Sequence, residues 1–282
     1  MIERMRPALG TFVQVSVDPL GLSDVQVERA MAVAFAAIDL THQLMSVHDA
    51  HSDLSVLNQS AHLIDYRPHP WTLAVLRRAL RLYHWSDGVF DCAVAARRLT
   101  EWGMLPQHSL HPVDTAGQPA TLADVHCLTN GAIRFDRPLA LDFGGIAKGF
   151  AVDMAVLALY RAGVRTAVVN AGGDLRVLGA TAQPVAVRHP QDPQQLVAIG
   201  ELAHGAVASS AVYYSAMQMS AGQSVSALVN PRDQRAIVAA QSWTVIAPNA
   251  TMADGLTKVL AVTQDQQHPT LIRCGAQAII LS

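Results

Sequence analysis

Cysteine is scarce in this sequence of 282 residues, which contains only Cys92, Cys127 and Cys274. They are odd in number, far apart and in no C-x-x-C arrangement, which argues against a disulfide framework and against a zinc site. We expect them to be small core residues. The twelve histidines are scattered along the chain and do not form the H-E-x-x-H spacing of a metal site.

Charge of one sign and long apolar runs are also missing. The 20 basic and 22 acidic residues give a formal net charge of -2, and no basic run forms a face for nucleic acid. No stretch is long and apolar enough to span a bilayer, and the N-terminus lacks the apolar core of a signal peptide. The chain as written is expected in the cytoplasm, and a longer native N-terminus would indicate the periplasm.

Aromatic residues make up 5% of the chain, which supplies few rings to stack a nicotinamide, and no dinucleotide fingerprint for a second cofactor is present. A plain oxidoreductase is therefore disfavoured. Hydrophobic residues make up 51%, enough for a substantial buried core.

The first half of the chain predicts long helices. A strand over 10–17 precedes a helix over 24–45, and a second helix over 70–85 follows a polar loop over 46–58. The stretch 106–138 is rich in His, Pro, Gly and Asp and is expected to be an irregular excursion.

The second half predicts a helix over 146–163, a helix over 252–262 and many short strands. This mixture favours an α+β fold with mixed, mostly antiparallel sheets and packed helices. The strands are predicted at 139–142, 164–170, 175–178, 184–188, 197–202, 225–229, 243–247 and 276–281.

The densest motif is D-F-G-G-I-A-K-G, from Asp142 to Gly149. Its glycines permit close backbone approach to a ligand, the following helix N-terminus favours an anion, and Lys148 adds a positive charge. A turn that needs glycine only for packing, with Lys148 in solvent, is an equally good interpretation of the motif alone.

Two further motifs are weaker. The run N-A-G-G-D, from Asn170 to Asp174, is also typical of a glycine hairpin. Asp254 and Thr257 lie at i and i+3 of a predicted helix and share one face, an arrangement that suits Mg²⁺. The alternative interpretation of Asp254 is a carboxylate near a helix N-terminus that the helix dipole favours.

The order of the motifs is more specific than any one of them. Taken together they resemble the ApbE-type FAD:protein FMN transferases, a family once labelled as thiamine-biosynthesis lipoproteins. The motifs are Leu9 to Val13, Leu44 to Ser46, Ser52 to Asn58, Gly88 to Asp91, Asp142 to Gly149, Asn170 to Asp174, Ala208 to Ser210 and Ala253 to Lys258.

The resemblance implies one ApbE-like domain over residues 1–282, with two lobes that meet at a central cleft for FAD. The implied reaction is Mg²⁺-dependent transfer of the FMN half of FAD onto a Thr or Ser hydroxyl of an acceptor protein, with AMP released. Implied FAD-binding residues are Val89, Phe90, Asp91, Asp142, Lys148 and Leu228, and implied Mg²⁺ ligands are the Gly145 carbonyl, Asp254 and Thr257. The candidate catalytic residues are Asp254 and, for its own positive charge, Lys258.

Three positions depart from the family pattern. Lys258 stands where the family commonly has a second hydroxyl ligand, and its ammonium cannot coordinate a metal but could pair with Asp254 or contact phosphate. Where the family has a His-Ile-x-Asp-Pro run, this chain has Ala227 to Pro231, which lacks the histidine and the acidic residue. The T-S-G stretch of the family is Ser209-Ser210-Ala211 here.

Two alternatives to a transferase remain open on the sequence. One is a protein that binds and delivers FAD without catalysis, because the histidine is missing. The other is a pyrophosphatase that cleaves FAD to FMN and AMP with water in place of the acceptor hydroxyl.

Overall fold

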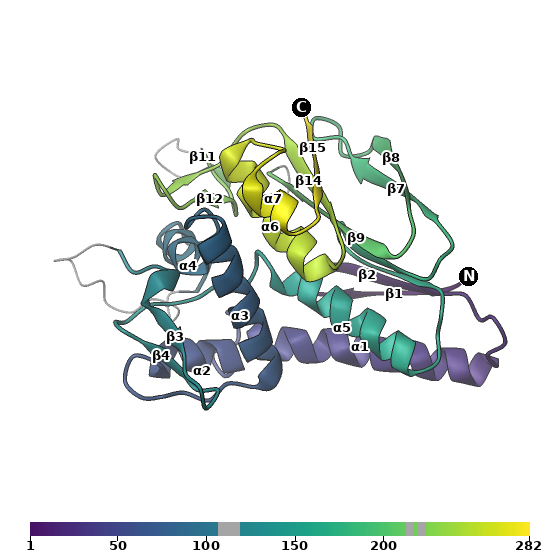
Figure 1. The fold of residues 1–282 in the computed structure, drawn as a ribbon, viewed down its shortest axis with the longest axis horizontal. Helices are drawn as coiled ribbons and strands as arrows, with labels where there is room; N and C mark the ends of the chain where they lie inside the picture. The colour runs from purple at the N-terminus through teal and green to yellow at the C-terminus, as the bar shows by residue number, and fades with distance from the viewer. Residues whose placement is uncertain (107–118, 213–216, 219–223) are drawn as a thin grey trace.

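An antiparallel sheet of seven strands forms the centre of the computed structural model, which describes residues 1–106, 119–212, 217–218 and 224–282. The strand order is β1-β2-β5-β6-β9-β14-β15 (Figure 1). Every pair of neighbours runs antiparallel. The strands are β1 (Ile2–Ala8), β2 (Thr11–Val17), β5 (Ala167–Ala171), β6 (Asp174–Leu178), β9 (Gly205–Ala211), β14 (Ser242–Ala247) and β15 (Gln277–Leu281).

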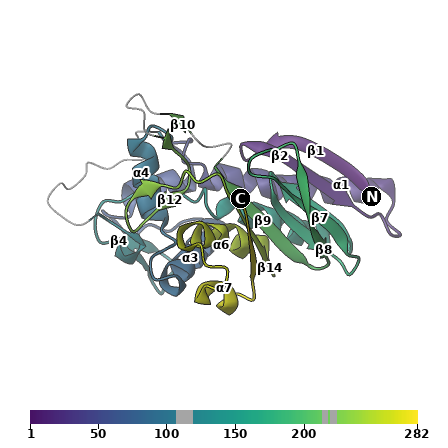
Figure 2. The same ribbon diagram turned by 90° about the horizontal axis from the view of Figure 1, so that it is seen from above.

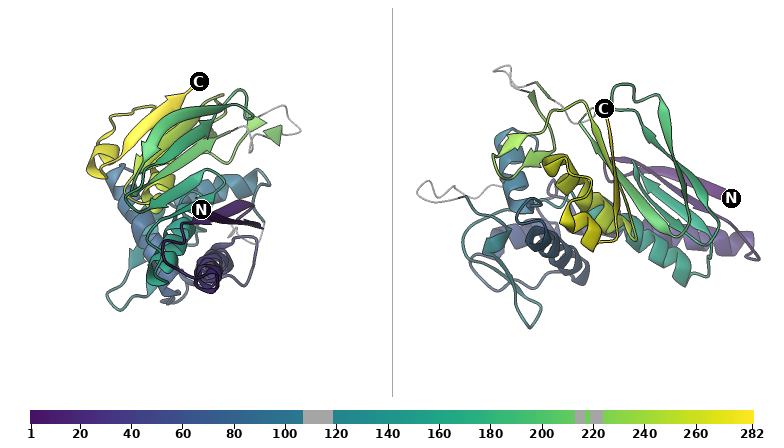
Figure 3. Two further views of the ribbon diagram at one scale, coloured as in Figure 1. Left: turned by 90° about the vertical axis from the view of Figure 1, so that its right-hand side faces the viewer. Right: turned by 45° about the horizontal axis from the view of Figure 1, so that its top comes forward.

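Three helices cover one face of this sheet. α1 (Asp24–Met45) packs along α5 (Ala147–Arg161), and α5 packs along α6 (Ala250–Thr263), which also contacts β9 and β14. The left-hand view of Figure 3 shows α1 end-on below the sheet. The main core therefore lies between the sheet and these helices, where Val15, Val169 and Val245 are fully buried.

A second group of elements lies at the end of the molecule opposite the β1–β2 hairpin, as the view from above shows (Figure 2). They include α2 (Asp53–Ser60), α3 (Pro70–Trp85), α4 (Cys92–Glu101), the short 3₁₀ helix η2 (Leu122–Asp124), and the hairpins of β3 (Val125–Cys127) with β4 (Ile133–Phe135), β10 (Met217–Gln218) with β11 (Ser224–Val225), and β12 (Val229–Asn230) with β13 (Arg235–Ala236). The hairpin of β7 (Gln183–Arg188) with β8 (Leu196–Leu202) and the helix α7 (Pro269–Arg273) complete the described elements.

The α+β prediction is confirmed, and local signals account for the best-predicted elements. α3 has the predicted bounds because His69 caps its N-terminus and Pro70 occupies the first helical position. α1 begins at a capping box, in which Ser23 and Gln26 bind each other's backbone.

Three predictions of local structure were wrong. The loop 46–58 contains the start of α2, which Ser52 caps. Residues 139–142 are not a strand, because the backbone N–H and carbonyl of Leu141 bind the side-chain amide of Asn58, each at 3.0 Å, rather than a neighbouring strand. The strand predicted at 225–229 is divided between β11 and β12, because the Ser226 hydroxyl accepts from Leu228 N–H and donates to the Ile237 carbonyl.

Several elements were missed altogether, and one region was described too coarsely. The strands β1, β9, β10 and β13 and the helices α4 and α7 were not predicted. Asp91 caps α4, and His268 with Pro269 begins α7, so both helices carry a local start signal. Residues 107–118 of the predicted excursion lie outside the described residues, whereas 119–138 contain η2 and the β3–β4 hairpin.

The crossing of α5 and α6 fixes the geometry of the site described below. A Cβ on Gly149 would lie 2.1 Å from the Ala250 carbonyl oxygen, so only glycine allows the two helices to approach this closely. Asp153 of α5 accepts the backbone N–H groups of Ala250 and Thr251, both at 2.9 Å, and pairs with Arg176 of β6 at 2.6 Å. The N-terminus of α6 is therefore tied to α5 and to the sheet.

None of the helices in the described part of the chain combines the length and apolarity needed to cross a bilayer.

Candidate functional site

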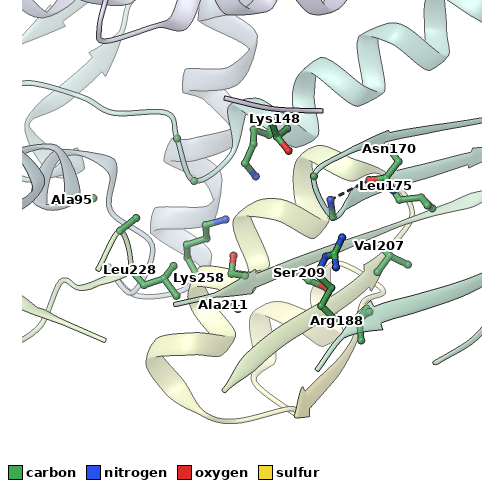
Figure 4. A pocket seen from close by; sticks show the side chains of 18 of the residues that line it. Ala95, Lys148, Asn170, Leu175, Arg188, Val207, Ser209, Ala211, Leu228 and Lys258 are labelled. Carbon is green, nitrogen blue, oxygen red and sulfur yellow. Dashed lines mark hydrogen bonds between the residues drawn. The ribbon is translucent and has the colours of Figure 1, made fainter. Parts of the chain in front are cut away.

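A cavity of about 820 Å³ opens where the glycine turn before α5, the β5–β6 hairpin, β9 and the 227–231 segment meet. This volume is within the range of small-molecule and cofactor sites. Figure 4 shows side chains that line it. Of the ten residues selected from the sequence, eight line the cavity: Val89, Phe90, Asp91, Asp142, Gly145, Lys148, Leu228 and Lys258. The other two, Asp254 and Thr257, are fully buried.

The segment from Asp142 to Gly145 is a turn and does not end a strand. The carboxylate of Asp142 accepts the backbone N–H of Gly144 at 3.0 Å. Burial raises the pKa of Asp142, and this hydrogen bond and the charges of His48 and Lys258 only partly offset it. The turn therefore presents a carboxyl group whose proton affinity is above that of an exposed aspartate.

The N-terminus of α5 is completed by a residue of another helix. Ile146 precedes α5 and provides no side-chain cap, and the N–H of Gly149 belongs to the first turn, where no carbonyl of the helix can accept it. Asp254 of α6 accepts this N–H through Oδ2 at 3.1 Å. One oxygen of Asp254 thus links the glycine turn before α5 to α6.

Lys148 extends from the same first turn into the cavity and pairs with Asp174. Asp174 follows the two-residue turn of the β5–β6 hairpin, in which Gly172 and Gly173 both have positive φ, at +63° and +106°. The hairpin interpretation of the N-A-G-G-D run is confirmed, and the hairpin also delivers a carboxylate to Lys148.

The pair of Lys148 and Asp174 is strongly affected by burial. Burial and the nearby carboxylate of Asp254 raise the pKa of Asp174 to about 6, in spite of Lys148. Burial alone would lower the pKa of Lys148, but Asp174 and Asp254 outweigh it and raise that pKa. Lys148 therefore stays an ammonium ion, and its partner Asp174 is a residue to which the sequence had assigned no role.

Lys258 binds the oxygen of the Asp254 carboxylate that Gly149 does not use. Its Nζ lies 2.5 Å from Asp254 Oδ1 and 3.2 Å from the Asp254 carbonyl oxygen, so the predicted pairing of these two residues is confirmed. Burial would raise the pKa of Asp254, but the charges of Lys148 and Lys258 reverse this effect and lower it. The nitrogen ends of both lysines point into the space between α5, α6 and the sheet (Figure 4).

Thr257 binds within α6 and to the sheet. Its hydroxyl donates to the Asp254 carbonyl at 2.6 Å, and its Oγ1 lies 2.7 Å from the Oγ of Ser210 on β9. Because the one proton of Thr257 is used in the helix, Ser210 is the donor in the second contact. Asp254 and Thr257 share a helix face, as predicted, but the hydrogen bond between them joins the Thr257 hydroxyl to the backbone carbonyl of Asp254 and not to its carboxylate.

The wall formed by residues 89–91, α4 and Leu228 is mostly apolar. Phe90 and Leu228 are 3% and 6% exposed, so each packs into the protein as well as lining the cavity. Asp91 caps α4 and accepts three backbone N–H groups, those of Ala93, Val94 and Leu122. Burial nevertheless raises the pKa of Asp91 to about 6.

The departures from the family pattern also lie at the cavity. Ala227 is exposed and lines it, and no histidine belongs to the lining in the described part of the chain. Phe12 of β2 and Arg188 of β7 line the cavity and are exposed, and the sequence had not indicated them. No local signal could have found them, because the β1–β2 and β7–β8 hairpins reach the cavity only through the fold.

The described residues contain no group of three or more His, Cys, Asp or Glu side chains that could hold a metal ion. The metal site that the resemblance implies would depend on one carboxylate, that of Asp254, and on hydroxyl and carbonyl oxygens.

Comparison with known proteins agrees with this arrangement. A sequence model of the ApbE family matches residues 9–280. An FAD:protein FMN transferase of Rhodobacter capsulatus is 27% identical over 96% of this chain and 53% of its own length, so the chain spans about half of that relative. One from Salmonella typhimurium is 26% identical over 97% of this chain and 81% of its own length.

Solved structures show the same fold. The flavin transferase ApbE from Vibrio cholerae has a TM-score of 0.80 at 22% identity and covers 99% of this chain and 92% of its own. The apo form of the Pseudomonas stutzeri flavinyl transferase ApbE has a TM-score of 0.79 at 21% identity, over 98% and 89%. Since the family model spans almost the whole sequence, the chain belongs to the ApbE family.

Proposed function

We propose that this chain is an FAD:protein FMN transferase, which moves the FMN half of FAD onto a Thr or Ser hydroxyl of an acceptor protein. The observation that carries the proposal is the meeting of Lys148 and Lys258 at one cavity beside a glycine turn. Two ammonium groups and a helix N-terminus suit a diphosphate. The names of the relatives supply the reaction class.

The reaction is a displacement at phosphorus. The acceptor hydroxyl oxygen forms a bond to the phosphorus of the FMN half, the bond from that phosphorus to the bridging oxygen breaks, and AMP leaves with the bridging oxygen. The acceptor proton is released to a base. Lys148 and Lys258 would stabilise the negative charge that grows on the phosphates and on the leaving AMP, because a fixed cation in a partly buried site needs no reorganisation.

The remaining predicted residues would bind the rest of FAD. Val89, Phe90 and Leu228 offer apolar surface for the rings, and Asp142 offers a carboxylate for a hydroxyl or N–H of the ligand. Asp142 is also the candidate for receiving the acceptor proton, since Ala227 stands where the family has histidine and the pKa of Asp142 is raised. Asp91 is expected to act mainly by holding α4 in place.

Magnesium at Gly145, Asp254 and Thr257 stays a prediction, and the residues present fit it poorly. One oxygen of Asp254 holds the Gly149 N–H and the other holds Lys258. The Thr257 hydroxyl has donated its proton within α6 and accepts from Ser210. A hard cation that needs several oxygen ligands would have to displace an ammonium group from the only carboxylate in the set.

The proposal is tested by incubating the chain with FAD and a candidate acceptor that carries an accessible Thr, with a Thr→Ala acceptor as the control. Intact mass of the acceptor and nucleotide chromatography are the measurements. Gain of one FMN by the Thr acceptor alone, with AMP released, supports transfer. Free FMN and AMP would instead indicate the pyrophosphatase, and unchanged bound FAD would indicate the delivery protein.

A further inference from the structure

The lysine usage of this chain is unusual. Lys148 and Lys258 are the only two lysines in the 282 residues, and the other 18 of the 20 basic residues are arginines. Both lysines line the same cavity, and each contacts a fully or almost fully buried aspartate. A lysine ammonium is a compact point charge, whereas the guanidinium of arginine is a wide planar fork. The chain therefore uses the compact cation only where a small, concentrated positive charge faces this cavity.

Lys258 occupies the space between the residues predicted to be metal ligands. Its Nζ contacts the carboxylate and the carbonyl of Asp254, at 2.5 and 3.2 Å. Its chain passes over Gly145, where a Cβ would lie 3.3 Å from the Lys258 Cε. The side chain is 20% exposed, so the ammonium is largely enclosed but still borders the cavity.

The charges around this position are already balanced. Lys148 pairs with Asp174 and Lys258 pairs with Asp254, so two ammonium groups already face two carboxylates. A divalent cation added at Asp254 would meet two ammonium groups at close range. Like charges in a site of low dielectric repel strongly, so the ammonium and the metal are alternatives at this position.

We propose that Lys258 is the resident cation of the diphosphate site and takes the place of a divalent metal. FAD then binds through its diphosphate to the ammonium groups of Lys148 and Lys258, and neither binding nor transfer requires Mg²⁺. This inference rests on the proposed function for the identity of the ligand. It assigns Lys258 a direct contact with the diphosphate, and it assigns Asp254 the task of holding Lys258 and the start of α5.

The first test is calorimetric titration of the full chain with FAD, once in EDTA and once in millimolar Mg²⁺. The wild-type affinity should be the same in both. Lys258→Met, which keeps the length of the side chain without its charge, should bind FAD about tenfold more weakly or worse in EDTA. Lys258→Arg is the matched control that keeps the charge, and it should bind FAD more tightly than Lys258→Met. Thermal melting of each variant verifies that it is folded.

Lys258→Thr tests the exchange of ammonium for metal. It removes the cation and adds an oxygen beside Asp254, so FAD binding should weaken in EDTA and recover in Mg²⁺. Electron paramagnetic resonance of Mn²⁺, with FAD at saturation, gives a reading independent of activity. The baseline is the free Mn²⁺ signal in the presence of FAD alone. Adding the Lys258→Thr variant should lower the signal below this baseline, whereas adding the wild type should not.

Stoichiometric Mn²⁺ binding by the wild type with FAD, or FAD binding that needs Mg²⁺, would overturn the proposal. Equal FAD affinity of Lys258→Met and the wild type in EDTA would overturn it as well. FMN-transfer assays in EDTA and in Mg²⁺ distinguish failure of the resident-cation proposal from failure of the proposed transferase function. FMN transfer that occurs only with Mg²⁺ refutes the resident cation and leaves the transferase, whereas metal-free FAD binding with no transfer in either buffer refutes the transferase.

Discussion

The pKa values of two buried aspartates near the cavity shift in opposite directions. Asp254, which is buried in α6 and does not line the cavity, binds the Gly149 N–H and the Lys258 ammonium, and positive charge lowers its pKa. Asp91, on the wall made by α4, binds three backbone N–H groups and, among the residues that the structure describes, no cation; its pKa is raised to about 6.

The difference shows what kind of partner keeps a buried carboxylate ionised. Neutral N–H donors offset only part of the desolvation of Asp91, whereas the charges of two lysines more than offset that of Asp254. The wall of α5 and α6 is therefore a permanent charge cluster suited to a diphosphate. The wall of α4 is a structural support with apolar side chains toward the cavity.

The largest effect on stability is expected from Gly149→Ala, which disrupts the packing of α5 against α6. The new Cβ would lie 2.1 Å from a backbone carbonyl oxygen of Ala250, and backbone cannot move aside as a side chain can. We expect a loss of about 3 kcal/mol or more in the free energy of unfolding, measured in urea.

Gly255→Ala is the matched control, because Gly255 is also a buried glycine inside a helix. Its new Cβ would meet Leu82 Cδ1 at 2.4 Å, the end of a side chain. Leu82 can shift, and alanine favours the helix by about 1 kcal/mol. Equal losses in the two variants would contradict the close backbone approach of α5 to α6 as the cause.

The next effect concerns Asp91, which caps α4, and the pH dependence of its contribution to the free energy of unfolding. Asp91 has a pKa of about 6 in the folded protein, above the ordinary value of 3.8, so folding binds a proton between these pH values. Its contribution to stability is therefore greatest below the unfolded pKa and is lost as the pH rises through about 6. The expected loss between pH 4 and pH 7 is at most about 3 kcal/mol.

Asp91→Asn isolates this contribution, since it cannot titrate and can still cap α4 through its carbonyl oxygen. The measurement is urea unfolding of both proteins at several pH values. The wild type should lose stability relative to Asp91→Asn as the pH rises from 4 to 7. If the wild type instead gains stability relative to Asp91→Asn from pH 4 to 7, the N–H donors lower the pKa of Asp91 by more than burial raises it. Asp91 would then no longer differ from Asp254 in the direction of its pKa shift.

A smaller effect is expected from removing one charge of the cluster. Lys148→Met should weaken FAD binding about tenfold and FMN binding less, because FMN has one phosphate and FAD has two. Calorimetry with both flavins measures the difference, and Lys148→Arg is the control that keeps the charge. If FAD and FMN lose affinity equally, Lys148 does not distinguish a diphosphate from a single phosphate.

The sequence predicted those features that depend on neighbouring residues. The bounds of α3 follow from His69 and Pro70, and the β5–β6 turn follows from two adjacent glycines with positive φ. The pairing of Lys258 with Asp254 follows from their i, i+4 spacing. These signals act within one or two turns of chain, so no knowledge of the fold was needed to detect them.

The fold alone decided which distant residues meet. Asn58 and Leu141 are 83 residues apart, and their contact replaces the strand expected at 139–142. Gly149 and Asp254 are 105 residues apart, and their hydrogen bond makes Asp254 the anchor of α5.

The sequence by itself therefore determined the ApbE-type order of motifs, the α+β class and the positions of two lysines among the arginines. Only the tertiary structure decided that both lysines face one cavity and that Lys258 takes the space between Gly145 and Asp254. The physical reason is that local spacing fixes which side chains share a helix face. Burial and the close packing of α5 on α6 fix which charges must neutralise one another.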